Sequence, residues 1–382
     1  MDFNLTEEQR MYREIARKFA EKVIRPRAFE MDEKAEFPYD IAQKMGELGF
    51  MGIPFPEKYG GVGGDWVSMM LCIEEISWGD ISLGTLLDVT TTVVANLLYS
   101  FGAEEQKQRW LIPMAQGKEI GVFGLTEPDS GSDAAASRTR AYLDGEEWVI
   151  NGRKQFITNV GLKNASIMIT TVKIRDPETE KDVINSIIIP VDTPGFIIEP
   201  KYSKLGWRAS DTHPVALEDC RVPKENLLGE PGRGFAHHLQ VLATGRISVA
   251  AMSVGLAQAC LDESLSYAKV RVQFGQPICK FQGTSFKLAD MATEIELARL
   301  MYLKAAWLAD QGEDFRKECY MAKLFASEAA NRAANSAVQI HGGYGFTNEY
   351  PVSRWWREVK INEIGEGTSE VQRMLISRLL GC

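Results

Sequence analysis

The sequence lacks the residue patterns that mark disulfide-rich and metal-binding proteins. Its six cysteines are scattered, and none forms a C-x-x-C pair. This spacing argues against a disulfide framework or a zinc site and suits a reducing compartment. The four histidines share no i, i+4 spacing, so we expect no metal site.

Signals for membranes and nucleic acid are also missing. No apolar run approaches the length of about 18 residues that marks a membrane-spanning helix. The N-terminus shows neither an apolar signal core nor an Arg/Ser-rich presequence. The net charge of −9 argues against nucleic acid or an anionic membrane as the main partner. We therefore expect a soluble cytoplasmic protein, with the mature form of a mitochondrial matrix protein as the alternative.

The common sequence signatures of nucleotide and hydrolase sites are absent as well. No G-x-G-x-x-G follows a strand, and no G-x-x-x-x-G-K-[ST] segment occurs. No G-x-S-x-G segment marks a nucleophilic serine. Any nucleotide bound by this chain must therefore be held in another way.

The apolar periodicity changes twice along the chain, which predicts a mainly α protein with a β insert. A chain of 382 residues, 45% apolar and 25% charged, is long enough for two or three domains. We expect an N-terminal helical domain over residues 1–118, a middle β domain over 119–229 and a C-terminal helical domain over 230–382. The middle domain suits a small barrel or sandwich, and the last suits a four-helix bundle.

Local patterns place the helices of the first domain. Thr6 to Gln9 has capping-box spacing, and apolar residues then recur every four positions, which predicts a helix ending near Pro26. A helix follows at about 40–48, then an irregular Gly/Pro-rich stretch at 49–64. Further helical pattern covers about 66–101 and 104–115.

The later elements follow from the same reasoning. An Asp144-Gly145 turn predicts a hairpin over 142–150. Other short β-rich runs occupy 121–126, 156–158, 167–172, 184–191 and 215–217. Long helical patterns then cover about 235–272, 284–311 and 313–340.

A carboxylate flanked by glycines, Gly365-Glu366-Gly367, precedes the last helical pattern. Glycine lets the backbone approach a ligand, and a helix N-terminus offers unpaired N–H groups. In such a loop Glu366 is either a base with room for a substrate beside it or an acidic first-turn residue that complements the helix dipole.

Four other segments combine polar groups with glycine or aromatic residues. Residues 125–133 offer backbone donors and hydroxyls to a heterocycle or phosphate, and 156–159 offer an aromatic face for a planar ring. Residues 271–275 end a helix with a cation and an amide, which suits a diphosphate. Residues 339–346 are a helix end with a glycine loop. Taken singly, each is also compatible with an ordinary turn, strand, helix end or C-cap.

In this order and spacing, the segments resemble the acyl-CoA dehydrogenase family from about residue 3 to residue 380. The resemblance implies the three-domain architecture above, a non-covalent FAD, a homotetramer and an electron-transfer flavoprotein as electron acceptor. The motifs that carry it are the segment 121–133 with Thr126-Glu127-Pro128 and Gly131-Ser132-Asp133, Phe156-Ile157-Thr158-Asn159, Arg271-Val272-Gln273-Phe274-Gly275, Gln339-Ile340-His341-Gly342-Gly343 and Glu366-Gly367-Thr368.

The resemblance also implies roles for individual residues. The expected contacts of the flavin ring and its loop are Phe123, Leu125, Thr126, Gly131, Phe156 and Thr158. The expected contacts of the FAD tail are Arg271, Gln273, Phe274 and Gln282, while Gln339 and Gly343 match positions that reach the FAD of a neighbouring subunit. Thr368 and Glu370 match positions near the FAD phosphates. Ser132, Arg246 and Gly367 are expected to contact the acyl-CoA substrate.

By the same resemblance, Glu366 is the catalytic base. Removing the α-proton of a thioester requires a positioned base and stabilisation of the developing enolate oxygen. The Glu366 N–H and a flavin hydroxyl would bind the thioester carbonyl, while hydride passes to flavin N5. Substrate binding excludes water, which should raise the pKa of Glu366. Some branches of the family place the base at the position of Gly245, which has no side chain here.

Two positions depart from the family pattern and bear on the substrate. Gly365 stands where a bulky residue is common, which enlarges the acyl pocket. Asp88 stands where a small residue is common; it is either a helix-surface carboxylate or cap, or a second acid/base in the pocket. The second interpretation resembles alicyclic (cyclohexene-carboxyl) CoA dehydrogenases, which can perform 1,4- as well as 1,2-dehydrogenation.

Other functions remain as alternatives. Within the family, the alternative is a short- or branched-chain acyl-CoA dehydrogenase of fatty-acid or amino-acid catabolism. Outside it, the alternatives are a flavin monooxygenase of the same fold, which typically lacks the base, and a non-catalytic acyl-CoA binder. An oxidase using O₂ usually needs a longer chain.

Overall fold

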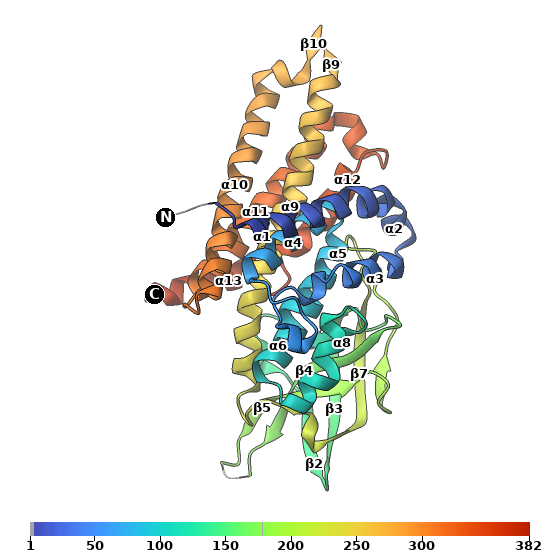
Figure 1. Ribbon diagram of the computed structural model, residues 1–382, viewed down its shortest axis with the longest axis vertical. Coiled ribbons are helices and arrows are strands. Elements are labelled where there is room, and N and C mark those ends of the chain that lie inside the picture. Colours follow the sequence, from blue (N-terminus) through green and yellow to red (C-terminus); the bar gives the residue numbers. More distant parts are fainter. Residues whose placement is uncertain (1–3, 178) are drawn as a thin grey trace.

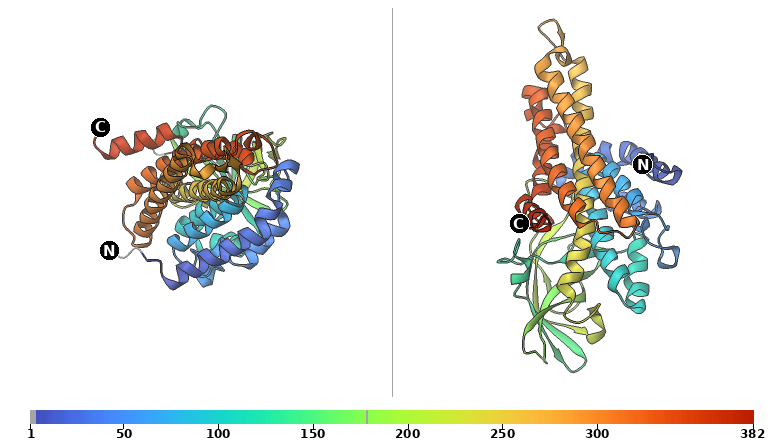
Figure 2. Two further views of the ribbon diagram at one scale, coloured as in Figure 1. Left: turned by 90° about the horizontal axis from the view of Figure 1, so that it is seen from above. Right: turned by 90° about the vertical axis from the view of Figure 1, so that its left-hand side faces the viewer.

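The computed structural model describes residues 4–177 and 179–382. Figure 1 shows the large sheet at one end of an elongated molecule and a long helical hairpin, tipped by two short strands, at the other, with the N-terminal helices against the middle. The helix α9 (Gly234–Val270) runs from the sheet end toward the tip of the hairpin, as the right-hand view of Figure 2 also shows. This helix therefore spans most of the length of the molecule, from the sheet to the helical hairpin.

The first domain is helical, as the sequence predicts. Thr6 caps α1, and its hydroxyl and the Gln9 side chain form the expected capping box. The glycine-rich stretch before Trp66 contains only two short 3₁₀ turns. The elements are α1 (Glu7–Phe19), η1 (Ala20–Ile24), η2 (Arg25–Arg27), α2 (Ala28–Lys34), α3 (Tyr39–Glu47), η3 (Phe50–Gly52), η4 (Glu57–Tyr59), α4 (Trp66–Gly79), α5 (Ile81–Leu87), η5 (Asp88–Ala95), α6 (Asn96–Phe101), α7 (Glu104–Gln106), η6 (Lys107–Leu111) and α8 (Ile112–Ala115).

The predicted continuous helix over 66–101 is wrong in one respect. Asp80 adopts an extended backbone, φ −159° and ψ 125°, and its side chain accepts a hydrogen bond from the Ser82 N–H. This is an N-cap, so a second helix begins at Ile81. After Leu87 the chain widens into the π-helical segment η5 before α6. The apolar pattern is continuous across both features and hides them.

The middle domain contains an eight-stranded mixed sheet in the order β6-β7-β3-β2-β4-β5-β8, with β1 paired to β4. The predicted hairpin is present, because β2 and β3 pair antiparallel from Asp144 opposite Glu147. Residues 156–158 belong to this same β3 rather than to a separate strand. The strands are β1 (Ile120–Gly124), β2 (Arg140–Asp144), β3 (Glu147–Thr158), β4 (Ala165–Arg175), β5 (Asp182–Pro190), β6 (Phe196–Ile198), β7 (Thr212–Pro223) and β8 (Leu227–Leu228).

The last domain is built on three long helices. Gly255 lets α9 touch α4, because a Cβ there would lie 2.1 Å from the Glu74 carbonyl oxygen. The elements are α9 (Gly234–Val270), β9 (Val272–Gln273), β10 (Gln276–Pro277), α10 (Gln282–Asp310), α11 (Arg316–His341), η10 (Gly342–Phe346), α12 (Val352–Glu358), η11 (Val359–Glu363) and α13 (Ser369–Leu379).

Two helical segments have the length and apolar composition of membrane spans, contrary to the expectation from the sequence. They are Ile81–Phe101 and Gly234–Val270, and 94% and 89% of their most apolar windows are buried inside the protein. Core helices of folded proteins have the same character. In this fold both segments form the interior against which the other helices and the sheet pack.

Candidate active site

Glu366 lies in a strained loop between η11 and α13. Its φ is 53° and that of Gly367 is 96°, so two successive residues are left-handed. Arg246 Nε donates to the Glu366 carbonyl oxygen at 3.0 Å. Lys323 Nζ and Gln372 Nε2 donate to the Gly367 carbonyl oxygen at 2.8 and 2.9 Å. Side chains from α9, α11 and α13 thus fix this backbone conformation, in which left-handed Glu366 costs on the order of 1–3 kcal/mol while Gly367 adopts a positive φ without strain.

The carboxyl group of Glu366 rests on Gly245 of α9. A Cβ at residue 245 would lie 2.4 Å from Glu366 Oε2 and 2.7 Å from Oε1, closer than any real contact. Glycine is therefore required at residue 245 for Glu366 to occupy this place. Glu366 therefore fills the space that a side chain at residue 245 would otherwise occupy.

Asp88 lies beside Glu366 and is not a surface carboxylate. It is the first residue of η5, and only 3% of its surface is exposed. The Thr92 hydroxyl donates to Asp88 Oδ1 at 3.0 Å, which orients the carboxyl group. A π-helical segment is rare and often marks a functional site. The structure thus brings together the two carboxyl groups that the sequence singles out.

The two carboxyl groups perturb each other. Burial raises the pKa of Glu366 well above its usual range, and the charge of Asp88 raises it further. Burial raises the pKa of Asp88 to about 6, against the opposing effect of the Ser248 and Thr92 hydroxyls. Two adjacent carboxylates can hydrogen-bond only when one carries a proton; as a carboxylate, Glu366 Oε2 has no partner among the described residues. Burial and the repulsion between the two groups therefore both favour a shared proton on the pair.

Two buried cations face this pair. Arg246 is buried, and its guanidinium carbon lies 4.9 Å from the Tyr320 ring centroid. Lys323 has 0% of its surface exposed, and burial lowers its pKa to about 8, against the attraction of Glu366. The Arg246 side chain binds the Glu366 carbonyl oxygen. The contact of Arg246 with CoA stays a prediction. Lys323 and Gln372 were not identified from the sequence.

The expected flavin-ring residues gather at one edge of the sheet. The Gln155 N–H donates to the Thr126 carbonyl oxygen at 2.8 Å, which joins the loop after β1 to the end of β3. Phe156 has a φ of 59° and is 64% exposed, so its ring faces outward beside Tyr202, 5.2 Å between centroids. Thr158 is partly buried at the end of the same strand.

These residues fit a flat heterocycle. Phe156 offers an aromatic face, and Thr126 and Thr158 offer hydroxyl groups at the same edge. A Cβ at Gly131 would meet nothing within 4 Å, and Ser132 beside it is exposed, so the loop borders open space. Phe123 and Leu125 are partly buried, and the Phe123 ring lies 4.9 Å from the buried His238 ring between centroids.

A buried ion pair supports this loop from beneath. Lys154 Nζ lies 2.8 Å from Glu127 Oε1, and both side chains are almost fully buried. Glu127 also accepts hydrogen bonds from the backbone N–H groups of Arg138 and Thr139. Glu127 lies within the Thr126-Glu127-Pro128 motif, for which the sequence predicts no separate role of this carboxylate. Once the strand is known, the position of Lys154 on its inner face implies an acidic partner, because a buried lysine needs one.

The other expected FAD contacts lie elsewhere. The helix α9 has 37 residues, so at 1.5 Å per residue it is about 55 Å long. His238, beside Phe123, is in its second turn, and Arg271 caps its far end. Arg271, Gln273, Phe274 and Gln282 lie at the tip of the helical hairpin, and Gln339 and Gly343 lie at the C-terminal end of α11. Within one chain, these residues therefore lie far from the flavin-ring group.

Thr368 and Glu370 lie at the N-terminus of α13, next to Glu366. The Thr368 hydroxyl accepts a hydrogen bond from the Val371 N–H at 3.3 Å and caps the helix. Glu370 is exposed in the first turn. Their predicted place near the FAD phosphates stays a prediction.

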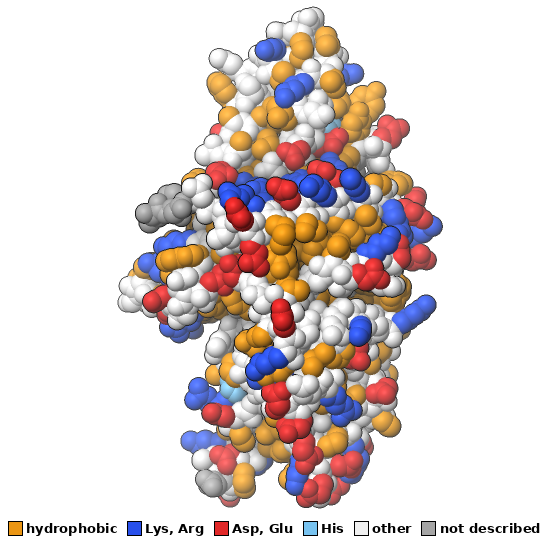
Figure 3. Space-filling view, in the orientation of Figure 1, with side chains coloured by type: hydrophobic (Ala, Val, Ile, Leu, Met, Phe, Trp, Pro, Cys, Tyr) orange, Lys and Arg blue, Asp and Glu red, His pale blue; other side chains and the backbone are white. Residues whose placement is uncertain are grey.

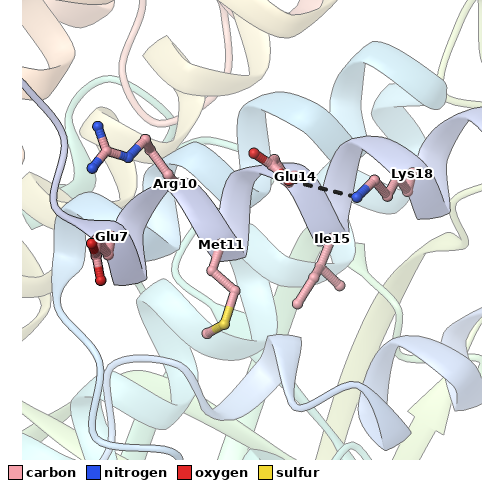
Figure 4. Close-up of a pocket in the computed structure, with 6 residues that line it drawn as sticks. All are labelled: Glu7, Arg10, Met11, Glu14, Ile15 and Lys18. Atoms are coloured by element: carbon pink, nitrogen blue, oxygen red, sulfur yellow. Dashed lines mark ion pairs between the residues drawn. The ribbon is translucent and has the colours of Figure 1, made fainter.

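The outer surface of α1 carries a shallow hollow that is unrelated to these groups. Its lining residues all come from one helix, and the Glu14 and Lys18 side chains pair across it at 3.5 Å (Figure 4). It contains none of the residues described above. The lining residues are Glu7, Arg10, Met11, Glu14, Ile15 and Lys18.

Comparison with known proteins covers the whole chain. Family profiles match residues 6–118 (acyl-CoA dehydrogenase, N-terminal domain), 122–220 (middle domain) and 232–381 (C-terminal domain). The chain is 53% identical to "Probable acyl-CoA dehydrogenase YngJ" of Bacillus subtilis, covering 100% of both chains.

Two solved structures are closely similar. Butyryl-CoA dehydrogenase of Megasphaera elsdenii is 41% identical with a TM-score of 0.96, and the match covers 100% of both chains. A chain from a study of the electron transferring flavoprotein of Acidaminococcus fermentans is 44% identical with a TM-score of 0.96, covering 100% of this chain and 99% of that one.

Proposed function

Because the chain belongs to the acyl-CoA dehydrogenase family, whose members are FAD-dependent oxidoreductases, we propose that Glu366 is the base that removes the α-proton of its acyl-CoA substrate. The observation that carries this proposal is the fit between the Glu366 carboxyl and Gly245. The carboxyl is buried, and its backbone is fixed by donors from three helices.

The residues around Glu366 suit proton abstraction. Because its pKa is raised, deprotonated Glu366 is a stronger base than an exposed carboxylate. The difference between its pKa and that of the weakly acidic thioester α-C–H is therefore smaller. Arg246, Lys323 and Gln372 hold the carbonyl oxygens of residues 366 and 367, so the N–H groups of residues 367 and 368, in the same two peptide units, are fixed in direction. Such preorganised N–H groups can stabilise the developing enolate oxygen. FAD, when bound at the Phe156 edge, supplies the oxidant for the β-hydrogen.

The variant Glu366→Gln tests the base. The amide keeps the shape but cannot accept the α-proton, so we expect FAD content and thermal stability close to wild type and a loss of acyl-CoA-dependent flavin bleaching of at least about 10³-fold. Glu313→Gln, in the exposed turn between α10 and α11, is the matched control and should bleach normally. Retention of most activity by Glu366→Gln would refute the assignment.

For the substrate we propose a compact, alicyclic acyl group such as a cyclohexane- or cyclohexene-carboxyl thioester. Asp88 supports this, because a second buried carboxyl beside the base can exchange a proton with a more distant ring carbon. Gly365 supports it too: a Cβ there would have only the Ile361 carbonyl oxygen near it, at 3.5 Å, so the residue leaves space. The second candidate is a short- or branched-chain acyl group, favoured by the similarity to butyryl-CoA dehydrogenase.

A panel of thioesters separates these candidates. Anaerobic bleaching should be measured with straight, branched, cyclic and dicarboxylic acyl-CoAs. The alicyclic proposal requires the highest kcat/KM on a cyclic substrate; a preference for butyryl-CoA would establish the second candidate. Asp88 would repel a second carboxylate unless a nearby cation compensates for it, and Arg246 and Lys323 both act on Glu366, so the dicarboxylic substrates test whether they do.

The proposal includes an electron-transfer flavoprotein as electron acceptor, as the resemblance and the family imply. It also includes a homotetramer, since the expected FAD contacts are divided between two ends of the chain. A cytoplasmic location is proposed from the scattered cysteines and the net charge of −9.

A further inference from the structure

Lys323 is a buried cation that the proposed chemistry does not yet use. It lies in the N-terminal third of α11 with 0% of its surface exposed, among small buried residues such as Ala322 and Ala326. Lysine is almost never fully buried unless it is paired, because removing an ammonium from water is costly. Some group near Lys323 must therefore compensate for its burial.

Hydrogen bonding alone does not account for the lysine. Its Nζ donates to the Gly367 carbonyl oxygen at 2.8 Å. Gln372 Nε2 already donates to that same oxygen at 2.9 Å and is neutral. A second donor could be neutral as well, so the positive charge of Lys323 needs a separate explanation.

The charge of Lys323 faces the carboxyl pair. Glu366 lowers the free energy of the charged ammonium, and Lys323 in turn acts to lower the pKa of Glu366. Asp88 acts in the opposite direction on the same carboxyl. Together with Arg246, the buried site holds two acidic and two basic side chains, so its formal charge is zero when all four are ionised.

The remaining charges near Lys323 have partners of their own. Glu363 of η11 pairs with Lys360, and Glu328 of α11 lies 2.7 Å from an Arg373 nitrogen atom of α13. Arg246 of α9 is engaged by the Glu366 carbonyl oxygen. Arg246 and Lys323 both lower the pKa of Glu366, Arg246 by more, so Lys323 is one of two cations whose charge acts on the carboxyl pair.

We propose that Lys323 is a positioning residue for the reaction, which anchors the Gly367 peptide and supplies, together with Arg246, the positive charge that lets Glu366 exist as a carboxylate beside Asp88. This inference rests on the proposed role of Glu366. Without the ammonium charge, the site would keep its shared proton to higher pH, and a protonated Glu366 cannot accept the α-proton.

Three substitutions separate charge from hydrogen bonding. Lys323→Met removes both, Lys323→Gln keeps a donor without the charge, and Lys323→Arg keeps both. We expect the acidic limb of the kcat/KM–pH profile to move to higher pH by about one unit in the Met and Gln variants. The Arg variant should restore the wild-type limb, and Lys317→Met, on the exposed face of α11, should not change it.

A second measurement does not depend on turnover. The infrared band of the protonated Glu366 carboxyl, identified as the band lost in Glu366→Gln, should disappear at higher pH in Lys323→Gln than in wild type. FAD content and thermal unfolding are measured for every variant. If Lys323→Gln lowers stability but leaves both the pH profile and the infrared titration unchanged, the lysine is only structural and the inference is wrong.

The outcome distinguishes this inference from the proposed function. An active Glu366→Gln would overturn the assignment of the base. An inactive Glu366→Gln together with unshifted Lys323 variants would overturn only the role of Lys323.

Discussion

Asp88 acts on the Glu366 carboxyl in the direction opposite to Lys323. Its negative charge raises the pKa of Glu366, whereas the ammonium of Lys323 lowers it. The pKa of Glu366 is therefore set by a balance between Asp88 on η5 and the cations Arg246 on α9 and Lys323 on α11. Removing the charge of Asp88 should lower the pKa of Glu366, and removing the charge of Lys323 should raise it.

The variant Asp88→Asn should move the acidic limb of the kcat/KM–pH profile to lower pH, by about one unit. The sign follows because the amide has no charge, so Glu366 loses its proton more easily. The double variant with Lys323→Gln should return toward wild type. Asp314→Asn, on a surface pair with Arg316, is the control and should leave the profile unchanged.

The same variant tests the role of Asp88 in the substrate pocket. If Asp88 exchanges a proton with the ring, turnover of a cyclic acyl-CoA falls in Asp88→Asn more than turnover of butyryl-CoA. Unchanged turnover of cyclic substrates would remove the case for a second acid/base.

At this scale the sequence shows the acids better than the cations. Glu366 is visible because glycines flank it, and Asp88 is visible because it stands where a small residue is common in the family that the sequence resembles. Lys323 stands in an alanine-rich helix whose pattern does not reveal which face is buried, and lysines are usually exposed. Its burial follows only from how α11 packs on α9 and the Glu366 loop.

At the scale of elements, the loop after β1 depends on the buried pair of Lys154 and Glu127. Burial lowers the pKa of Lys154 to about 8, while Glu127 opposes that shift. Removing one partner leaves the other charged and buried, which usually costs about 3–5 kcal/mol. The loop that carries Thr126 would lose its support from the sheet.

We therefore expect Lys154→Met to lower the melting temperature clearly and to release FAD more readily than wild type. Thermal unfolding followed by flavin fluorescence measures both. The control is Arg138→Gln, which removes the exposed pair of Arg138 with Asp129 at the surface of the same loop and should change stability little. Equal melting curves for the two variants would show that the buried pair does not support the loop.

The elements differ in how well the sequence predicts them. The capping box of α1 and the turn after Asp144 are local, so their residues suffice. The break at Asp80 and the π-helical segment from Asp88 lie inside one apolar stretch. Both depend on packing against α9, where the whole circumference of the helix is buried and periodicity carries no information.

At the scale of the whole molecule, α9 separates two groups of expected FAD contacts by most of its length of about 55 Å. The far group lies at a surface where Phe274 and Phe346 are 94% and 91% exposed. Hydrophobic side chains are visible at the hairpin end in Figure 3. Exposed aromatic side chains of this kind mark protein interfaces. A second copy of the chain can supply Arg271 to a flavin held at Phe156.

Mixing two defective subunits tests this arrangement. Arg271→Ala damages the hairpin group, and Thr158→Val together with Phe156→Ala damages the flavin-ring group; each protein alone should bind FAD poorly. When the two are co-expressed with different tags, a symmetric assembly that builds each site from two copies should recover FAD in about a quarter of the sites. The recovered flavin should co-purify with both tags and bleach with acyl-CoA. If both groups served a site within one chain, every site in the mixture would remain damaged and no FAD would return, so recovery depends on Arg271 reaching across the interface.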